Sequence, residues 1–412
     1  MRTDHAAHTS SLASAGDGAE FRASRRLNPL HREQHHNGAE TVRDPFLSRR
    51  AFLQLAGGAT IGLVAITTMG CEFNSVEPIT TGADVDFVTP ISEFYYKNGA
   101  EGSIANWTQP VIDRTAWRLR IDGLVTTPLE MTYADLVAET SHAIDLLKTM
   151  RCVIDSNEVQ GLIGTAVWRG VPLRLFLERA GVDHTRAVRL RLHGSDGFTN
   201  NVKIERIFGT GDTDLVEPLL VTHMNGELLP EKHGFPVRLM IHESFGYKNV
   251  KWLTRVEATD SDAPFGTYQS TGFIDDGVMR VVSRTTDPID NLALAAGRIR
   301  CVGFAVSGAQ GIDRIDISVD NGPFQTATIV PRNEVISASG QAAGVIQMVD
   351  DATHIYPWRG VWAKWVFEFD ATPGRHTIRF RAADRAGNVQ PDRDTDISDG
   401  INAVGSMTIT CT

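Results

Sequence analysis

The stretch Arg314-Ile315-Asp316-Ile317-Ser318-Val319-Asp320-Asn321-Gly322 decides how the C-terminal part of this chain folds. Its apolar residues stand at every second position, so they would share one face of a β-strand. Asp320-Asn321-Gly322 then offers residues that accept the left-handed backbone of a tight hairpin turn. We therefore expect a strand, a turn and a second strand that begins at Phe324.

The same alternation returns at Trp362 to Phe369 and at His376 to Ala382, with Thr372-Pro373-Gly374 as the turn between them. From Gly297 onward the pattern favours strands only. A sheet with one apolar face must cover that face with another layer. Residues 291–412 are therefore predicted to form an antiparallel β-sandwich.

Upstream, residues 85–262 mix short strands with helical stretches. Trp117 to Gly123 alternates as a strand and ends in glycine. Leu173 to Gly181 has the apolar spacing of a helix, with Gly181 in place to end it. This mixture predicts an α+β domain. Residues 263–290 show little periodicity and are predicted to be a connecting segment that can also line a site.

Composition sets the class of protein. The 412 residues suggest two or three domains at roughly 150 residues each. A content of 42% hydrophobic and 22% charged residues disfavours wholesale disorder, collagen and a polytopic membrane protein. The net charge is −10, from 40 basic and 50 acidic residues, and there is no long Lys/Arg run. Nucleic acid is not an expected partner, because phosphate backbones are bound by clustered positive charge.

The N-terminal part of the sequence indicates an export address. Residues 1–46 are rich in His, Arg, Gly, Ala and Ser and are predicted to be a disordered leader. Ser48-Arg49-Arg50-Ala51-Phe52-Leu53, with the uncharged stretch after it, predicts a twin-arginine signal over 47–71. The alternative is a single membrane-spanning anchor, because about 20 uncharged residues can span a bilayer. Residues 72–84 would be a linker.

Export by this route would place the protein in the periplasm or on the outside of the cytoplasmic membrane. Thr67 to Cys71 also permits lipoprotein processing, with a lipid anchor on Cys71. Twin-arginine translocation carries folded proteins, and a cofactor inserted in the cytoplasm is a common reason to fold first. We therefore expect a bound cofactor.

The four cysteines are too few and too scattered for a disulfide-stapled miniprotein or a paired zinc site. Cys301 and Cys411 fall in the first and last strands expected for the sandwich. They would either pair in an oxidising compartment or remain two separate buried thiols. Cys152 is the one cysteine inside the mixed domain. A lone cysteine is usually a small core residue, so its surroundings decide whether it has a function.

Two basic clusters supply such surroundings. His233-Gly234-Phe235-Pro236-Val237-Arg238 and Gly246-Tyr247-Lys248-Asn249-Val250-Lys251-Trp252 flank the strand-like Leu239-Met240-Ile241. A strand and its loops would bring a His, an Arg and two Lys together. Such a group would hold an anion, with Arg and His supplying directed hydrogen bonds.

At these residues the sequence resembles the sulfite oxidase family of molybdopterin oxidoreductases, over residues 85–395. The segments that resemble its molybdenum domain are Asp122-Gly123-Leu124-Val125, Leu129 to Leu136, Gly164 to Gly170, Met224 to Pro230, His233 to Arg238 and Val250-Lys251-Trp252-Leu253. Those that resemble its dimerisation domain are Ser318 to Gly322, Trp362 to Trp365 and Arg381 to Pro391. The resemblance implies an α+β molybdopterin domain over 85–262, an all-β immunoglobulin-like domain over 291–412, and a homodimer.

The resemblance also implies a role for each candidate site residue. Cys152 matches the cysteine whose thiolate ligates molybdenum, a role that suits a soft sulfur donor. Tyr96 and Lys97 match a stretch that reaches the substrate as well as the cofactor. The residues that match contacts to molybdopterin are Asn98, Asp196, His233, Arg238, Asn249, Val250 and Lys251, of which Asn249 and Val250 would contribute backbone groups.

Some positions depart from the family pattern. Lys97 and Gly99 replace an arginine and a histidine, and lysine lacks the planar fork that grips an oxyanion. Val153 to Glu158 carries two acids and no arginine, which would disfavour a dianionic substrate. The family's active-site tyrosine has no clear counterpart, because Tyr268 is a few residues early and Ser270 falls nearer the place. His242-Glu243 replaces a Pro-Gly pair.

The function implied by the resemblance is oxygen-atom transfer at molybdenum held by molybdopterin. Sulfite or a related sulfur compound would be oxidised, and the electrons would pass to a separate cytochrome or other carrier. One alternative is that the same centre reduces an S-oxide or N-oxide, which are neutral substrates. Another is a surface-anchored binding protein whose cofactor domain has lost activity.

Overall fold

The structure is a computed structural model that describes residues 86–99, 107–156, 160–209, 215–338, 355–394, 396 and 398–412. The leader predicted over 1–46, the twin-arginine signal predicted over 47–71 with its candidate lipidation site Cys71, and the linker predicted over 72–84 lie outside these ranges. Within the described ranges, no helix combines the length and the apolar character needed to cross a membrane.

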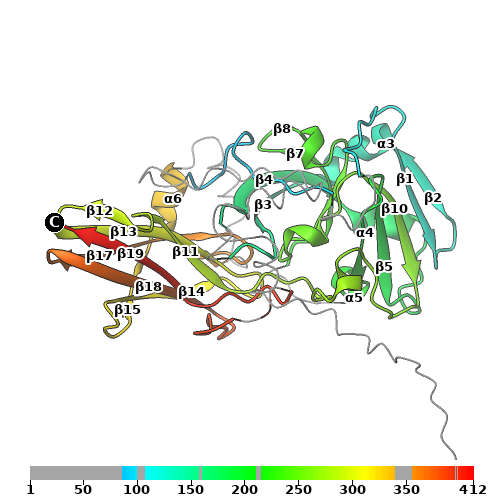
Figure 1. The fold of residues 1–412 in the computed structure, drawn as a ribbon. Coiled ribbons are helices and arrows are strands. Elements are labelled where there is room, and N and C mark those ends of the chain that lie inside the picture. Colours follow the sequence, from blue (N-terminus) through cyan, green and yellow to red (C-terminus); the bar gives the residue numbers. More distant parts are fainter. Residues whose placement is uncertain are drawn as a thin grey trace, which may run out of the picture. The chain divides into compact units, whose positions relative to one another are not determined.

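Five strands form the first sheet, in the order β2-β1-β10-β5-β6 (Figure 1). β1 and β10 are parallel, and the other neighbours are antiparallel. The strands are β1 (Arg118–Gly123), β2 (Leu129–Thr132), β5 (Arg189–Gly194), β6 (Thr199–Lys203) and β10 (Leu253–Thr259). Apolar residues of the α-helices α3 (Tyr133–Ala138), α4 (Leu173–Arg179) and α5 (Glu205–Phe208) share one core with this sheet.

β1 and α4 confirm two local predictions. In β1 the alternate residues Leu119 and Ile121 are fully buried, as the period of the sequence indicates. α4 ends where expected, because Gly181 adopts a left-handed φ of 64° and its N–H bonds back to Glu178 O at 2.9 Å.

The second sheet has the order β3-β4-β7-β8, with β9 beside β7. Its strands are β3 (Ile144–Arg151), β4 (Ile163–Pro172), β7 (Leu219–Met224), β8 (Glu227–Leu228) and β9 (Arg238–Met240). Short 3₁₀ helices lie between the strands of this domain and in the segment after it: η2 (Thr140–His142), η3 (Glu231–His233), η4 (Gly246–Lys248) and η5 (Gln269–Thr271). β3 is buried from Leu146 onward and ends directly before Cys152.

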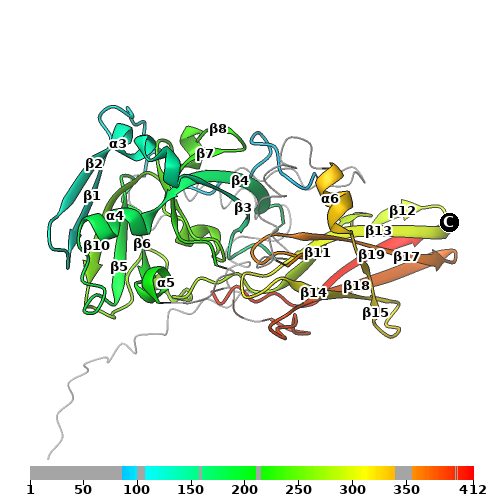
Figure 2. The ribbon, with the colours of Figure 1, turned by 180° about the vertical axis from the view of Figure 1, so that it is seen from behind.

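Two further sheets form the sandwich (Figure 2). One has the order β11-β13-β17-β16, made of β11 (Val282–Asp287), β13 (Gly297–Val306), β16 (Thr328–Ile329) and β17 (Ala363–Ala371). The other has the order β12-β19-β18-β14-β15, made of β12 (Leu292–Leu294), β14 (Ile312–Val319), β15 (Gln325–Thr326), β18 (Gly374–Asp384) and β19 (Gly405–Cys411). The helix α6 (Arg332–Ala338) follows β16.

The hairpin predicted at β14 is confirmed. Asp320 and Asn321 take left-handed φ values of 52° and 59°, and Gly322 N–H closes the turn onto Val319 O at 2.8 Å. β17 and β18, which follow one another in the sequence, pair with strands of different sheets. The turn at Thr372-Pro373-Gly374 therefore carries the chain from one layer of the sandwich to the other.

The segment predicted to connect the domains contains a strand. β11 lies within residues 263–290 and pairs with β13, so Cys301 in β13 is not in the first strand of the sandwich as expected. The sequence pattern did not predict β11, because its polar residues Ser283 and Arg284 are buried and do not alternate with apolar ones. Cys301 and Cys411 are both buried and unpaired, so the interpretation as two separate thiols is the correct one.

The second sheet and the sandwich share a continuous apolar core. Trp362, directly before β17, donates its indole N–H to Phe87 O at 2.9 Å and its backbone N–H to Thr149 Oγ1 of β3 at 2.8 Å. Thr149 N–H in turn donates to Gly360 O at 2.8 Å. β3, the strand that leads to Cys152, is therefore held on one side by the second domain.

Gly123→Ala should destabilise the protein strongly. Gly123 has a φ of 85°, and an added Cβ would overlap the carbonyl oxygen of Ala258 on β10. We expect the free energy of unfolding to fall by about 3 kcal/mol. Gly226→Ala is the control, because Gly226 has a similar φ of 83° and no atom within 4 Å of the new Cβ. Its loss should be about 1 kcal/mol. Equal losses in urea unfolding would show that the contact with β10 is unimportant.

Candidate active site

One pocket collects nearly all of the predicted site residues. It is lined by Tyr96, Lys97, Asn98, Cys152, Asp196, His233, Arg238, Asn249 and Lys251. The space that it encloses, counted out to its open mouth, is about 780 Å³. Val250 does not line the pocket. Its side chain packs in the core of the first sheet, and its carbonyl accepts from Leu239 N–H at 2.8 Å.

Cys152 is placed by the end of β3. Its N–H donates to Leu162 O at 2.9 Å, and its carbonyl accepts from Asp155 N–H at 3.1 Å, so residues 152–155 form a closed turn. Cys152 is partly exposed, whereas Cys301 and Cys411 are buried. Of the described cysteines, Cys152 is therefore the one whose thiol can meet a ligand in the pocket.

Arg238 and Lys251 bring basic side chains to the pocket. Arg238, 1% exposed, donates to the carbonyl oxygens of His233 and Asn249 at 3.0 and 3.1 Å, and its guanidinium lies 5.2 Å from the Trp168 ring centroid. Burial lowers the pKa of Arg238 to about 10. Among the described residues no carboxylate forms an ion pair with this guanidinium.

Lys251 is also bonded to neutral oxygens. Its Nζ donates to Lys232 O at 2.9 Å and to the side-chain oxygen of Asn98. Burial, assisted by the nearby charge of Arg238, lowers the pKa of Lys251 well below its ordinary value. Lys248, the other lysine of the cluster, donates to Asp275 O at 2.8 Å and does not line the pocket.

His233 and Asp196 complete the polar wall. His233 is 1% exposed, and burial, with Lys251 next in importance, lowers its pKa to about 2, so the imidazole is neutral. Asp196 stands in the turn between β5 and β6 and accepts from Phe198 N–H at 3.0 Å. Burial raises the pKa of Asp196 above its usual range. The neutral His233 imidazole is therefore poised for hydrogen bonding more than for ion pairing.

Tyr95 is a pocket residue that the sequence analysis missed in favour of Tyr96. Its side chain is 5% exposed, it lines the pocket, and its hydroxyl has no hydrogen-bond partner among the described residues. An added Cβ at Gly246 would lie 2.8 Å from this hydroxyl, which explains a glycine there. Burial, with the nearby Cys152 next, raises the pKa of Tyr95 well above its ordinary value. The phenol is thus a neutral, buried donor on a residue that lines the pocket.

Tyr96 and Lys97 also line the pocket, as predicted. The Tyr96 ring meets the His233 ring edge-on, with centroids 6.2 Å apart, and Lys232 Nζ lies 4.7 Å from the Tyr96 ring centroid. Tyr96 is therefore held between a buried imidazole and an ammonium group.

In the segment after β10, Tyr268 lines the pocket and Ser270 does not. Tyr268 lines it and packs against Phe198 and Tyr247 with ring centroids 5.8 and 5.7 Å apart. Ser270 is exposed and donates to Thr267 O at 2.9 Å. Ser270, which falls nearer the sequence position of the family's tyrosine, lies in a 3₁₀ turn that directs it to solvent.

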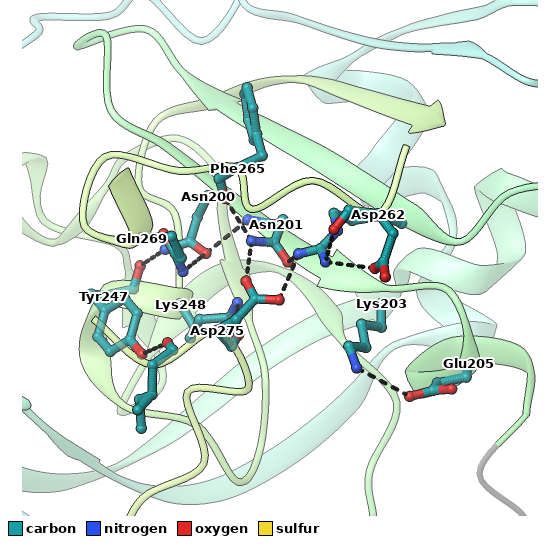
Figure 3. A network of polar contacts seen from close by, with 12 residues as sticks. Asn200, Asn201, Lys203, Glu205, Tyr247, Lys248, Asp262, Phe265, Gln269 and Asp275 are labelled. Carbon is teal, nitrogen blue, oxygen red and sulfur yellow. Dashed lines mark hydrogen bonds and ion pairs between the residues drawn. The ribbon is translucent and has the colours of Figure 1, made fainter. Parts of the chain in front are cut away.

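A buried polar network fixes the segment that carries Tyr268 (Figure 3). Asp275 accepts from Asn201 Nδ2 at 2.8 Å and from Arg189 Nη1 at 2.7 Å. Gln269 Nε2 donates to Asn200 Oδ1 at 2.9 Å. These bonds tie an irregular segment to the regular strands β5 and β6, and so give one wall of the pocket a fixed position.

Asp155 does not oppose an anionic substrate as the sequence analysis expected. Its side chain is 1% exposed, is not part of the pocket lining, and accepts from Arg151 Nε at 3.3 Å and from Arg284 Nη2 at 3.2 Å. Two cations therefore offset its charge. Glu158, the other acid of that stretch, lies outside the described residues.

The residues present fit an anionic cofactor that brings a metal. Among the described residues that line the pocket, three have a buried side-chain polar atom without a partner: Tyr95 Oη, His233 Nε2 and Arg238 Nε. Such atoms cost free energy unless a ligand satisfies them. Arg238 and Lys251 suit a phosphate, and the Cys152 thiolate suits a soft metal. Within the described ranges no group of three His, Cys, Asp or Glu could hold a metal, so a metal here would need donors from its cofactor.

Two family profiles match the chain. The Oxidoreductase molybdopterin binding domain matches residues 106–266, and the Mo-co oxidoreductase dimerisation domain matches residues 277–408. The first match includes Cys152 and the pocket residues from Asp196 to Lys251. The second covers most of the sandwich.

Plant nitrate reductases are similar to part of the chain. The nitrate reductase (NADH) of Solanum lycopersicum is 30% identical over 213 residues, and that of Spinacia oleracea is 29% identical over the same length. Each match covers 46% of this chain and 22% of the length of the reductase. The chain therefore spans less than a quarter of these relatives. Among solved structures, the sulfane dehydrogenase SoxCD from Paracoccus pantotrophus shares the fold, with a TM-score of 0.61 and 22% identity over 80% of this chain and 82% of that chain.

Lys251→Met should reduce the pH dependence of stability in the cofactor-free protein. The folded chain holds the pKa of Lys251 well below 10.5, so the unfolded chain binds this proton more tightly. The free energy of unfolding therefore falls as the pH drops below 10.5, by about 1.4 kcal/mol per pH unit until the folded pKa is reached. Urea unfolding from about pH 7 to pH 10 measures the slope. Lys203→Met, at an exposed lysine, should keep the wild-type slope. A wild-type slope in Lys251→Met would contradict the assignment.

Tyr95→Phe should stabilise the cofactor-free protein by about 1 kcal/mol, because it removes a buried hydroxyl that has no partner. Tyr247→Phe is the matched control. The Tyr247 hydroxyl donates to Ile274 O, so its removal should cost about 1 kcal/mol. Urea unfolding of both variants checks the opposite signs, and a loss of stability in Tyr95→Phe would show that its hydroxyl is satisfied.

Proposed function

Because the chain belongs to the sulfite oxidase family of molybdopterin oxidoreductases, we propose that it is a molybdenum enzyme that transfers an oxygen atom and oxidises sulfite or a related sulfur compound. One observation carries the proposal. A partly exposed thiol, Cys152, lines the same pocket as two basic side chains, the buried Arg238 and the partly buried Lys251, that form no ion pair with a carboxylate among the described residues. This combination suits a metal held by an anionic cofactor.

One group of pocket residues would bind the cofactor. Cys152 would supply a thiolate to molybdenum, and Arg238 and Lys251 would hold the phosphate. His233 and Asn98 would bond polar groups of the pterin. When bound, the cofactor supplies two-electron oxygen-atom transfer. Because these side chains are already held by backbone carbonyls and each other, little ordering is needed on binding.

The substrate would bind between residues 95–97 and the segment that carries Tyr268. Lys97 would attract an oxyanion as a point charge, and the phenols of Tyr95 and Tyr96 would donate hydrogen bonds. The negative charge of Asp155 would not oppose an anionic substrate, because Arg151 and Arg284 form ion pairs with this carboxylate. Sulfite is therefore not repelled by this turn.

The reaction needs water and an electron acceptor. Oxidation of sulfite to sulfate takes one oxygen atom from water and releases two protons and two electrons. A separate carrier, such as a soluble or membrane cytochrome, would accept the electrons one at a time. The sandwich would form a homodimer interface, as the description of its family profile indicates. The twin-arginine sequence supports export, and Cys71 a lipid anchor.

A second candidate function is reduction of an S-oxide or N-oxide at the same centre. Of the described lining residues, Arg238 is the one arginine, and it is bonded to backbone carbonyls deep in the site. The aromatic side chains of the lining are Tyr95, Tyr96, Phe198, Tyr247, Trp252 and Tyr268. An aromatic wall with a single arginine favours a neutral substrate with apolar groups.

Metal analysis of the purified protein should find about one molybdenum per chain. Cys152→Ala should lose turnover and remain folded, because the thiol is partly exposed and its removal leaves no large cavity in the core. Cys301→Ala, in the sandwich core, is the control and should keep turnover. A protein without molybdenum, or a Cys152→Ala variant with full turnover, would overturn the proposal and favour an inactive binding protein.

Steady-state assays on the loaded protein separate the two candidate reactions. Sulfite with oxidised cytochrome c should give turnover. Methionine sulfoxide with a reduced dye should give none, and the same holds for nitrate, which is tested because the plant relatives are nitrate reductases. Turnover of methionine sulfoxide alone would replace sulfite oxidation by S-oxide reduction.

A further inference from the structure

We propose that Arg284, on strand β11 of the sandwich, is a positioning residue for the metal-binding thiol. Through Asp155 it would hold the turn that carries Cys152 in place. The second domain would thereby form part of the metal site, in addition to any role in dimerisation. The inference takes from the proposed function only that Cys152 binds the metal.

Asp155 is the hub of the turn. Its Oδ2 accepts from Arg151 Nε at 3.3 Å and from Arg284 Nη2 at 3.2 Å. Its backbone carbonyl accepts from Arg151 Nη2 at 2.8 Å, and its N–H donates to Cys152 O at 3.1 Å. The three ionic side chains are 5% exposed or less. One carboxylate thus joins the residue before Cys152, the turn after it and a strand of the other domain.

Arg284 is itself fixed by the sandwich. It stands opposite Phe304 in the pairing of β11 with β13. Its Nη2 also donates to Asn402 Oδ1 at 2.6 Å, and its Nη1 to Ser283 O at 3.1 Å. The segment of Asn402 contacts the turn directly, since an added Cβ at Gly400 would lie 3.3 Å from Val153 Cγ2. The turn is therefore held from the sandwich by an ion pair and by packing.

Loss of Arg284 would leave Asp155 with one cation in place of two. A buried carboxylate with reduced compensation is unfavourable, and the turn can relieve it by opening toward solvent. Lysine would restore the charge but lacks the planar guanidinium, whose Nη1 bonds Ser283 O while its Nη2 bonds Asp155 and Asn402. Arg284→Lys should therefore act between wild type and Arg284→Ala.

The test is alkylation of Cys152 in the cofactor-free full-length chain, with iodoacetamide as the probe and mass spectrometry assigning each modified peptide. We expect Cys152 in Arg284→Ala to react about tenfold faster than in the wild type, with Arg284→Lys in between. Cys301 and Cys411 are buried and should stay unmodified, which shows that the fold is intact. After cofactor loading and dialysis, Arg284→Ala should retain less molybdenum than wild type.

Arg206→Ala is the matched control. Arg206 forms a buried bidentate pair with Glu243, at 2.7 and 2.9 Å, and is bonded to no residue of the turn. It should lower the melting temperature without a change in Cys152 alkylation. Unchanged alkylation in Arg284→Ala, or an equal increase in both variants, would overturn the proposal. If Arg284→Ala does not fold, Asn402→Ala decides in its place, with faster alkylation in support and an unchanged rate against. Because the readout needs no turnover, it stands apart from failure of the proposed reaction.

Discussion

Buried positive charge without a carboxylate partner is the constraint on which the pocket depends. Arg238 and Lys251 donate to backbone carbonyls and an amide oxygen, which leaves Arg238 Nε without a partner, and neither group forms an ion pair with a carboxylate among the described residues. The desolvation cost is visible in the lowered pKa values of both groups. Binding of an anion to these groups would offset the desolvation cost and stabilise the folded protein. Polar atoms of Tyr95 and His233 that lack partners follow the same logic.

Much of the site was predictable because its chemistry is concentrated in short runs. His233 to Arg238 and Asn249 to Lys251 lie close in the sequence, on either side of one strand, so local pattern and resemblance together led to them. The hairpin after β14 was predictable for a similar reason, since Asp, Asn and Gly are the residue types that adopt the left-handed backbone seen at Asp320 and Asn321.

The rest depended on contacts between distant residues. Tyr95 and Tyr96 are adjacent tyrosines outside regular secondary structure, and only packing shows that both line the pocket. Tyr268 is placed by a network in which Arg189 and Asp275 are 86 positions apart. Asp155 is an acid whose charge is offset by Arg284, 129 positions away. β11 lacks alternation because its buried polar groups have partners that the sequence does not reveal.

The free thiols of the sandwich also bear on where this protein can mature. Cys301 and Cys411 stand in strands of opposite layers, and neither forms a disulfide. The core is closed by Trp365, Ile317, Ile409 and their neighbours. Assembly of this layer pair thus requires no oxidant, and glutathione would not undo it.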